Sequence, residues 1–146
     1  MSSDGGPGPE VSRRLGYLFK HAGLRLAELH DEALGPFGID ARELGVLIVI
    51  GGHEPGSQQQ VAQRLSVDRT TMVALLDTLE AKGLVSRHPH TEDRRRNVVE
   101  LTTKGQGVLR RATRASDEAE RKLLAPLSPR DAQQLRDALQ LIVEPA

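Results

Sequence analysis

Three arginines stand in a row within the polar stretch TEDRRRN: Arg94, Arg95 and Arg96. They follow the acidic pair Glu92 and Asp93 and precede the β-branched pair Val98 and Val99. Guanidinium groups bind phosphate and enter the narrow minor groove of DNA, where the negative potential is strongest. We expect one arginine to enter the groove, one to meet a backbone phosphate, and one to pair with Glu92 or Asp93.

Two short strands are expected to hold these arginines at the end of a hairpin. Residues 84–87 and 97–101 are rich in β-branched residues, and residues 88–96 form the polar tip between them. The whole chain carries 20 basic and 20 acidic residues, but residues 84–98 hold four arginines against two acids. The hairpin is therefore a local basic patch in a neutral protein, and we expect Arg87 and His88 to contribute to it.

A pair of helices precedes the hairpin. A short helix from Ser57 to about Leu65 buries Val61, and a tight turn at residues 66–68 leads into a second helix that ends at Lys82 and Gly83. A short helix braced across a second one is the helix-turn-helix arrangement, in which the second helix offers its N-terminal side chains to the major groove. The expected exposed residues there are Asp68, Arg69, Thr70 and Thr71. Asp68 is expected to cap the helix more than to touch DNA.

Helices also flank this unit, so the predicted fold class is mainly α (α+β). An apolar stripe predicts one helix from Glu10 to about residue 34, after a disordered arm at residues 1–9. Asp40 and Glu43 form a capping box that opens a fully buried helix ending at the glycine pair 51–52. Thr102 or Thr103 caps a long helix, and Ser128 with Pro129 begins the last one.

Composition excludes several classes of function. The chain has no cysteine, which excludes disulfides, thiolate catalysis and cysteine-ligated zinc. It shows no nucleophile elbow, Gly-rich phosphate loop or zinc motif, so we predict neither an enzyme nor a cofactor. His88 and His90 with the neighbouring acids are better explained as a solvated hairpin tip than as a metal site. The polar start and the lack of long apolar runs predict a cytoplasmic protein without membrane contact.

The run SQQQVAQRLSVDRTTMVALLDTLEAKGLVSRHPHTEDRRRNVVELTTKG resembles the winged helix-turn-helix of the MarR family of bacterial transcription regulators. LEAKGLVSR, the DRR at residues 93–95 and LTTKG at residues 101–105 are the most specific elements. The resemblance implies a winged helix-turn-helix at residues 37–101 and dimerisation helices at residues 10–34 and 103–144, within a single domain of residues 10–146. By position, Gln58 and Gln59 match the phosphate-contacting start of the bracing helix, and the segment from Ser66 to Met72 matches the base-reading part.

The resemblance also implies a homodimer that binds a pseudo-palindrome in double-stranded DNA, acts as a repressor, and is released by a small aromatic or acidic ligand. The expected dimer interface comprises Leu15, Leu18, Leu123, Leu127, Leu135, Leu139 and Ile142. Three candidates for a ligand crevice are Tyr17, His21 and His53, although interface packing is the favoured interpretation of Tyr17 and a role in the turn is the favoured interpretation of His53.

Two departures from the family pattern bear on function. Ala74 stands where members often carry a basic residue, which places more weight on Arg69 and the hairpin. The missing cysteine excludes the peroxide-sensing branch. A second hypothesis is therefore a degenerate member that acts as a protein-interaction module without specific DNA binding.

Overall fold

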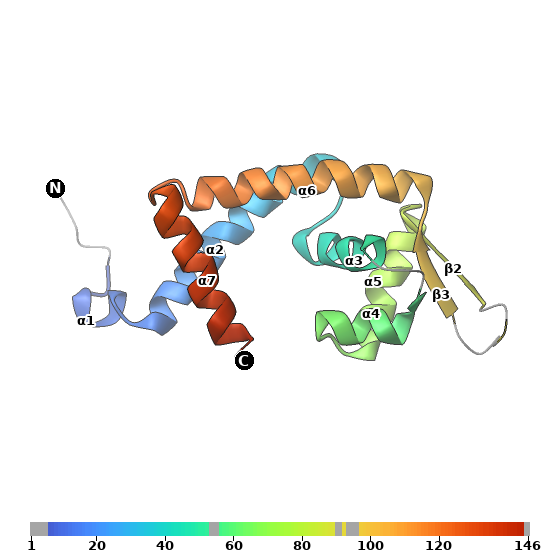
Figure 1. Ribbon diagram of the computed structural model, residues 1–146, viewed down its shortest axis with the longest axis horizontal. Coiled ribbons are helices and arrows are strands. Elements are labelled where there is room, and N and C mark those ends of the chain that lie inside the picture. Colours follow the sequence, from blue (N-terminus) through green and yellow to red (C-terminus); the bar gives the residue numbers. More distant parts are fainter. Residues whose placement is uncertain (1–5, 53–55, 90–91, 93–96, 145–146) are drawn as a thin grey trace. The chain divides into compact units, whose positions relative to one another are not determined.

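The computed structural model describes residues 6–52, 56–89, 92 and 97–144 (Figure 1). Its elements in chain order are α1 (Pro9–Ser12), α2 (Leu15–Leu34), η1 (Gly35–Phe37), α3 (Ala41–Gly51), β1 (Gly56–Ser57), α4 (Gln58–Leu65), α5 (Arg69–Ala81), β2 (Val85–Pro89), β3 (Asn97–Leu101), α6 (Thr103–Leu123) and α7 (Pro129–Val143). The chain forms two compact units, one of residues 30–116 and one that combines residues 1–29 with residues 117–146.

The unit of residues 30–116 joins α3, α4, α5 and the first part of α6 to a small antiparallel sheet. The strand order is β1-β3-β2, and the β2–β3 hairpin pairs Val85 with Leu101 and Pro89 with Asn97. Helices α3, α4 and α5 lie together beside this hairpin (Figure 1). The hairpin is thus confirmed, although β2 runs to Pro89 and so shortens the tip that was expected to begin at residue 88.

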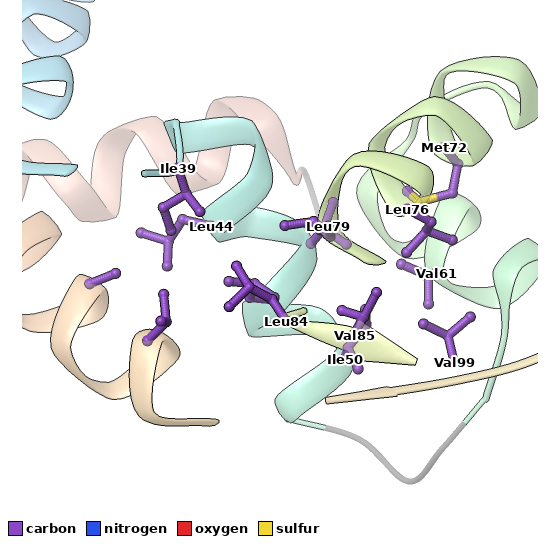
Figure 2. Packing of buried hydrophobic residues seen from close by; sticks show 14 of the residues in the cluster. Ile39, Leu44, Ile50, Val61, Met72, Leu76, Leu79, Leu84, Val85 and Val99 are labelled. Carbon is purple, nitrogen blue, oxygen red and sulfur yellow. The ribbon is translucent and has the colours of Figure 1, made fainter. Parts of the chain in front are cut away.

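A single aliphatic core holds this unit together, and Figure 2 shows its side chains converging from the helices and the hairpin. Leu47 comes from α3, Leu76 and Leu79 from α5, and all three are completely buried. Val85 and Val99 close the core from the sheet, at 2% and 1% exposure. Burial of such side chains is the main favourable term in folding, so this core fixes the hairpin against α5.

The capping box at the start of α3 is confirmed. The Glu43 backbone N–H donates to Asp40 Oδ1 at 2.8 Å, and the Asp40 N–H donates to Glu43 Oε1 at 3.0 Å. The prediction that α3 is buried on all sides is wrong, because Ile48 is 47% exposed. A continuous apolar run cannot show which face of a helix lacks a covering element.

Helix α5 ends as the sequence predicts, at Lys82 and a left-handed Gly83 with φ of 77°. The Lys82 side chain also makes two hydrogen bonds, because its Nζ donates to the Gly38 carbonyl and to Glu43 Oε2, both at 2.7 Å. Thr102 then caps α6 by accepting from the Gly105 N–H at 3.0 Å. Lys104 of α6 donates from Nζ to the Lys82 carbonyl at 3.1 Å, so Lys82 connects the end of α5 to both α3 and α6.

The other unit contains α1, most of α2, the end of α6, and α7. The predicted single helix from Glu10 is interrupted at Arg13 and Arg14, between α1 and α2. Ser12 and Gly16 flank this break and are weaker helix formers than Ala or Leu, and Val11 is 46% exposed, so packing does not hold the helix straight there. Ser128 caps α7 with Pro129 in its first turn, as predicted.

Candidate nucleic-acid interface

The turn between α4 and α5 sets the start of the recognition helix. Ser66 adopts a left-handed conformation with φ of 54°, an uncommon one for a non-glycine residue. Asp68 then caps α5, because its Oδ1 accepts from the Thr71 N–H at 2.7 Å and its Oδ2 accepts from the Thr71 hydroxyl at 3.0 Å. The Thr71 backbone hydrogen bond lowers the pKa of Asp68. Asp68 is therefore a capping residue, as expected.

The first turn of α5 presents fewer side chains than the resemblance implies. Arg69 and Thr70 are exposed, as a groove contact requires, while Thr71 is half-buried and engaged with Asp68. Met72 is 1% exposed and belongs to the core, so its assignment to the DNA contact is wrong. The helical spacing of apolar residues places Met72 on the same face of α5 as Leu76. This spacing is a better guide to the burial of Met72 than its place in the family motif.

Helix α4 contributes exposed polar residues beside the turn. Gln59 and Ser66 are exposed, and the side chain of Gln58 lies outside the described part of the structure. Arg64, in the last turn of α4, is also exposed and was not among the predicted contacts. Its position two residues before Ser66 is the signal that would have included it.

Arg87 has a different role from the one predicted. Its guanidinium Nη2 donates to Glu80 Oε1 at 2.8 Å and to Asp77 Oδ1, and its side chain is only 18% exposed. The hydrogen bond from Arg87 lowers the pKa of Glu80, while Glu80 and then Asp77 raise that of Arg87. Arg87 therefore braces β2 against α5, and its charge is paired with two carboxylates of that helix.

The pleat of the hairpin explains this pairing. Arg87 lies two residues after the buried Val85 and opposite the buried Val99, so it points to the same face of the sheet, toward α5. Asp77 and Glu80 are three residues apart on α5 and share one side of that helix. Sequence reasoning missed this contact because it joins two elements whose packing was not known.

His88 lies on the opposite face of the hairpin from Arg87. Its Nε2 is 2.7 Å from Glu100 Oε1, a diagonal contact across the strands. The hydrogen bond with Glu100, followed by the Pro89 carbonyl, raises the pKa of His88. His88 remains 47% exposed, so a phosphate contact is sterically open to it.

Several predicted site residues lie outside the described residues: Arg94, Arg95, Arg96 and His53. Tyr17 and His21 are described, and their ring centroids are 4.1 Å apart on α2. Within the described ranges, no group of three His, Asp or Glu residues is placed to hold a metal ion. No helix among the described residues has the length and hydropathy of a membrane span.

The comparisons with known proteins agree with this geometry. A family model described as MarR family matches residues 37–96. The HTH-type transcriptional regulator PecS of Dickeya dadantii is 30% identical over 112 residues, which are 75% of this chain and 68% of that protein. A solved structure of the transcriptional repressor CouR bound to a 23-mer DNA duplex is 31% identical, with a TM-score of 0.87, over 93% of this chain and 96% of that one. A MarR variant from E. coli complexed with operator DNA is 27% identical, with a TM-score of 0.80, over 88% and 92% of the two chains.

A helix-turn-helix followed by a β-hairpin defines a winged helix-turn-helix protein. This chain belongs to the MarR family of transcription regulators. The predictions of the family, of the mainly helical winged fold and of a transcriptional regulator are thereby confirmed.

Proposed function

We propose that this protein binds double-stranded DNA sequence-specifically as a homodimer and represses transcription. The observation that carries the proposal is the exposure of Arg69 and Thr70 at the start of α5, the same helix to which Arg87 fixes the hairpin through Asp77 and Glu80. Arg69 suits guanine O6 and N7, and Thr70 suits a phosphate or a thymine methyl. Structures with this fold, CouR and a MarR variant, were solved on DNA, and CouR is named a repressor.

The roles proposed for the parts of the chain follow the predicted domain organisation. Residues 37–101 bind DNA, and the helices of residues 10–34 and 103–144 form the dimer. The support is the apolar surface of the second unit: Leu15, Leu141, Ile142 and Val143 are each at least 67% exposed in the single chain. An apolar surface of this kind is typical of a surface that a protein partner covers.

A small molecule that controls DNA binding is part of this proposal. CouR from Rhodococcus jostii, which is 29% identical to this chain with a TM-score of 0.79 over 92% of it, was solved bound to p-coumaroyl-CoA. Tyr17 and His21 stay candidates for a ligand contact on α2, since a ring pair of this kind can stack on a planar ligand.

The test is the affinity of purified variants for a duplex that the wild-type protein retains, measured by fluorescence anisotropy at fixed salt. Arg69→Ala, Arg94→Ala and Arg95→Ala are each expected to weaken binding by about 1–3 kcal/mol. Arg130→Ala, an exposed arginine at the start of α7, is the matched control and should leave affinity unchanged. Equal affinities for all four variants would contradict the proposed interface, and a loss confined to Arg69→Ala would remove the hairpin tip from it.

A further inference from the structure

One exposed strip runs along α5 on the side opposite the core. Met72 and Leu76 lie in the core, at 1% and 0% exposure (Figure 2). At about 3.6 residues per turn, four exposed residues lie farthest from this buried side: Thr70, Ala74, Asp77 and Ala81. In a helix-turn-helix, the second helix lies in the major groove and its N-terminal residues contact base edges. The first two residues of the strip are therefore placed to meet bases.

The N-terminal half of this strip presents methyl groups and no charge. Thr70 carries a methyl beside its hydroxyl, and Ala74 carries a methyl alone. The first charged residue of the strip is Asp77, whose carboxylate accepts a hydrogen bond from Arg87. Beside the strip, the Thr78 hydroxyl donates to the Ala74 carbonyl at 3.1 Å, so it is directed to its own helix. The surface that faces the bases after Arg69 is thus largely apolar.

The methyl group of thymine is the feature of the major groove that fits such a surface. Each base pair presents a distinct pattern there, and among the four ordinary bases only thymine adds an apolar group, at C5. Alanine side chains and threonine methyl groups make apolar contacts with it. Thr70 and Ala74 are about 6 Å apart along the helix axis, which is roughly two base-pair steps of about 3.4 Å. A helix that follows the groove brings them against nearby bases.

We propose that Thr70 and Ala74 select thymine at one or two positions in each half of the pseudo-palindrome by contact with its C5 methyl group. Arg69 keeps the role of contacting guanine. The inference rests on the proposed function, because it requires α5 to lie in the major groove of DNA. It deepens that function by naming the base that the exposed strip prefers and the two side chains that select it.

The experiment uses uracil, which differs from thymine only by the absence of this methyl group. A duplex that the wild-type protein selects from random sequences is resynthesised with uracil in place of one thymine of one half-site at a time. Fluorescence anisotropy at fixed salt measures each affinity. We expect uracil to weaken binding about fourfold at one or two positions, the amount that burial of one methyl group contributes, and to change nothing elsewhere.

Two variants assign the contact to its residues. Thr70→Ser keeps the hydroxyl and removes only the methyl, and Ala74→Gly removes the other methyl. Each should abolish the preference for thymine over uracil at its own position. Thr78→Ser and Ala81→Gly make the same changes at exposed positions farther along α5 and should keep the wild-type preference. Because the preference is a ratio of two affinities of the same variant, a general loss of stability cancels.

Three results would overturn the inference while leaving the proposed function standing. They are a selected motif without thymine, equal affinity for thymine and uracil at every position, and a preference that survives in both Thr70→Ser and Ala74→Gly. A preference that survives in one of them would remove that residue from the contact. If the wild-type protein selects no motif at all, the proposed function fails together with this inference.

Discussion

The pair of His88 and Glu100 is the residue-scale feature with the clearest dependence on pH. The pKa of His88 in the folded protein is raised above its ordinary value because Glu100 stabilises the imidazolium. The stabilisation is therefore fully present below the unfolded pKa and is lost as the pH rises through the folded pKa. Both side chains are nearly half exposed, so the contribution is small.

Urea unfolding of wild-type protein and His88→Gln at pH 5.5 and pH 9 measures this contribution. We expect the wild type to exceed the variant in unfolding free energy at pH 5.5, and the difference to shrink by pH 9. A difference that grows with pH would contradict the assigned direction of the pKa shift.

Two glycines in the first turns of α6 should respond oppositely to the same substitution. A Cβ on Gly105 would lie 2.0 Å from the Leu84 carbonyl oxygen, a backbone atom that cannot rotate away. A Cβ on Gly107 would meet the ends of two flexible side chains, with Arg111 Nη1 at 3.4 Å and Arg110 Nη2 at 3.9 Å. We expect Gly105→Ala to lower the unfolding free energy by about 2–4 kcal/mol. Gly107→Ala should be neutral or stabilising by up to about 1 kcal/mol, because alanine is the better helix former. Thermal unfolding of both variants decides this, and equal melting temperatures would show that α6 does not approach Leu84 closely.

At the scale of elements, the brace between β2 and α5 determines how the wing meets the recognition helix. Neutralising its acids in the double variant Asp77→Asn/Glu80→Gln removes two negative charges, which by charge alone would tighten DNA binding. We expect the opposite, a several-fold loss of affinity, because Arg87 loses both carboxylates and the wing is no longer held in register with Arg69 and Thr70.

The matched control for the brace is the double variant Asp117→Asn/Glu118→Gln, which changes charge equally on an exposed part of α6. Anisotropy titrations at one salt concentration compare the two. If both double variants bind DNA more tightly, Asp77 and Glu80 affect DNA affinity only through their negative charge, and the proposed role of the brace is contradicted.

Local signals predicted most element boundaries. Three helix ends are marked in this way: Asp40 with Glu43, Gly83 after Lys82, and Ser128 before Pro129. Their side chains or backbone conformation satisfy the backbone N–H and C=O groups that have no partner within the helix. The two-residue strand β1 carries no such signal, since it is defined only by its pairing with Val98 and Val99.

The site was less predictable than the fold, because several of its contacts depend on how separate elements pack together. The exposure of Arg69 and Thr70 follows from the helix period, but the pairing of Arg87 with Asp77 and Glu80 depends on how the hairpin packs on α5.

At the scale of the whole molecule, the proposed dimer is the feature that the exposed apolar side chains of α2 and α7 require. Leu139→Asp should convert the dimer to a monomer, because a charge in an apolar interface is costly to desolvate. Gln134→Asp, at an exposed polar position of the same helix, is the control and should remain dimeric. Light scattering after size-exclusion chromatography measures both masses. A Leu139→Asp protein that keeps the dimer mass would place the interface elsewhere.

The central claim is that this protein reads a DNA sequence as a symmetric dimer. The most direct test is selection from random duplexes with the purified wild-type protein at near-physiological salt, followed by sequencing of the retained DNA. The account predicts an inverted repeat with half-sites about one helical turn apart. Retention without a common motif, or no retention at all, would contradict sequence-specific recognition and favour the interaction-module hypothesis.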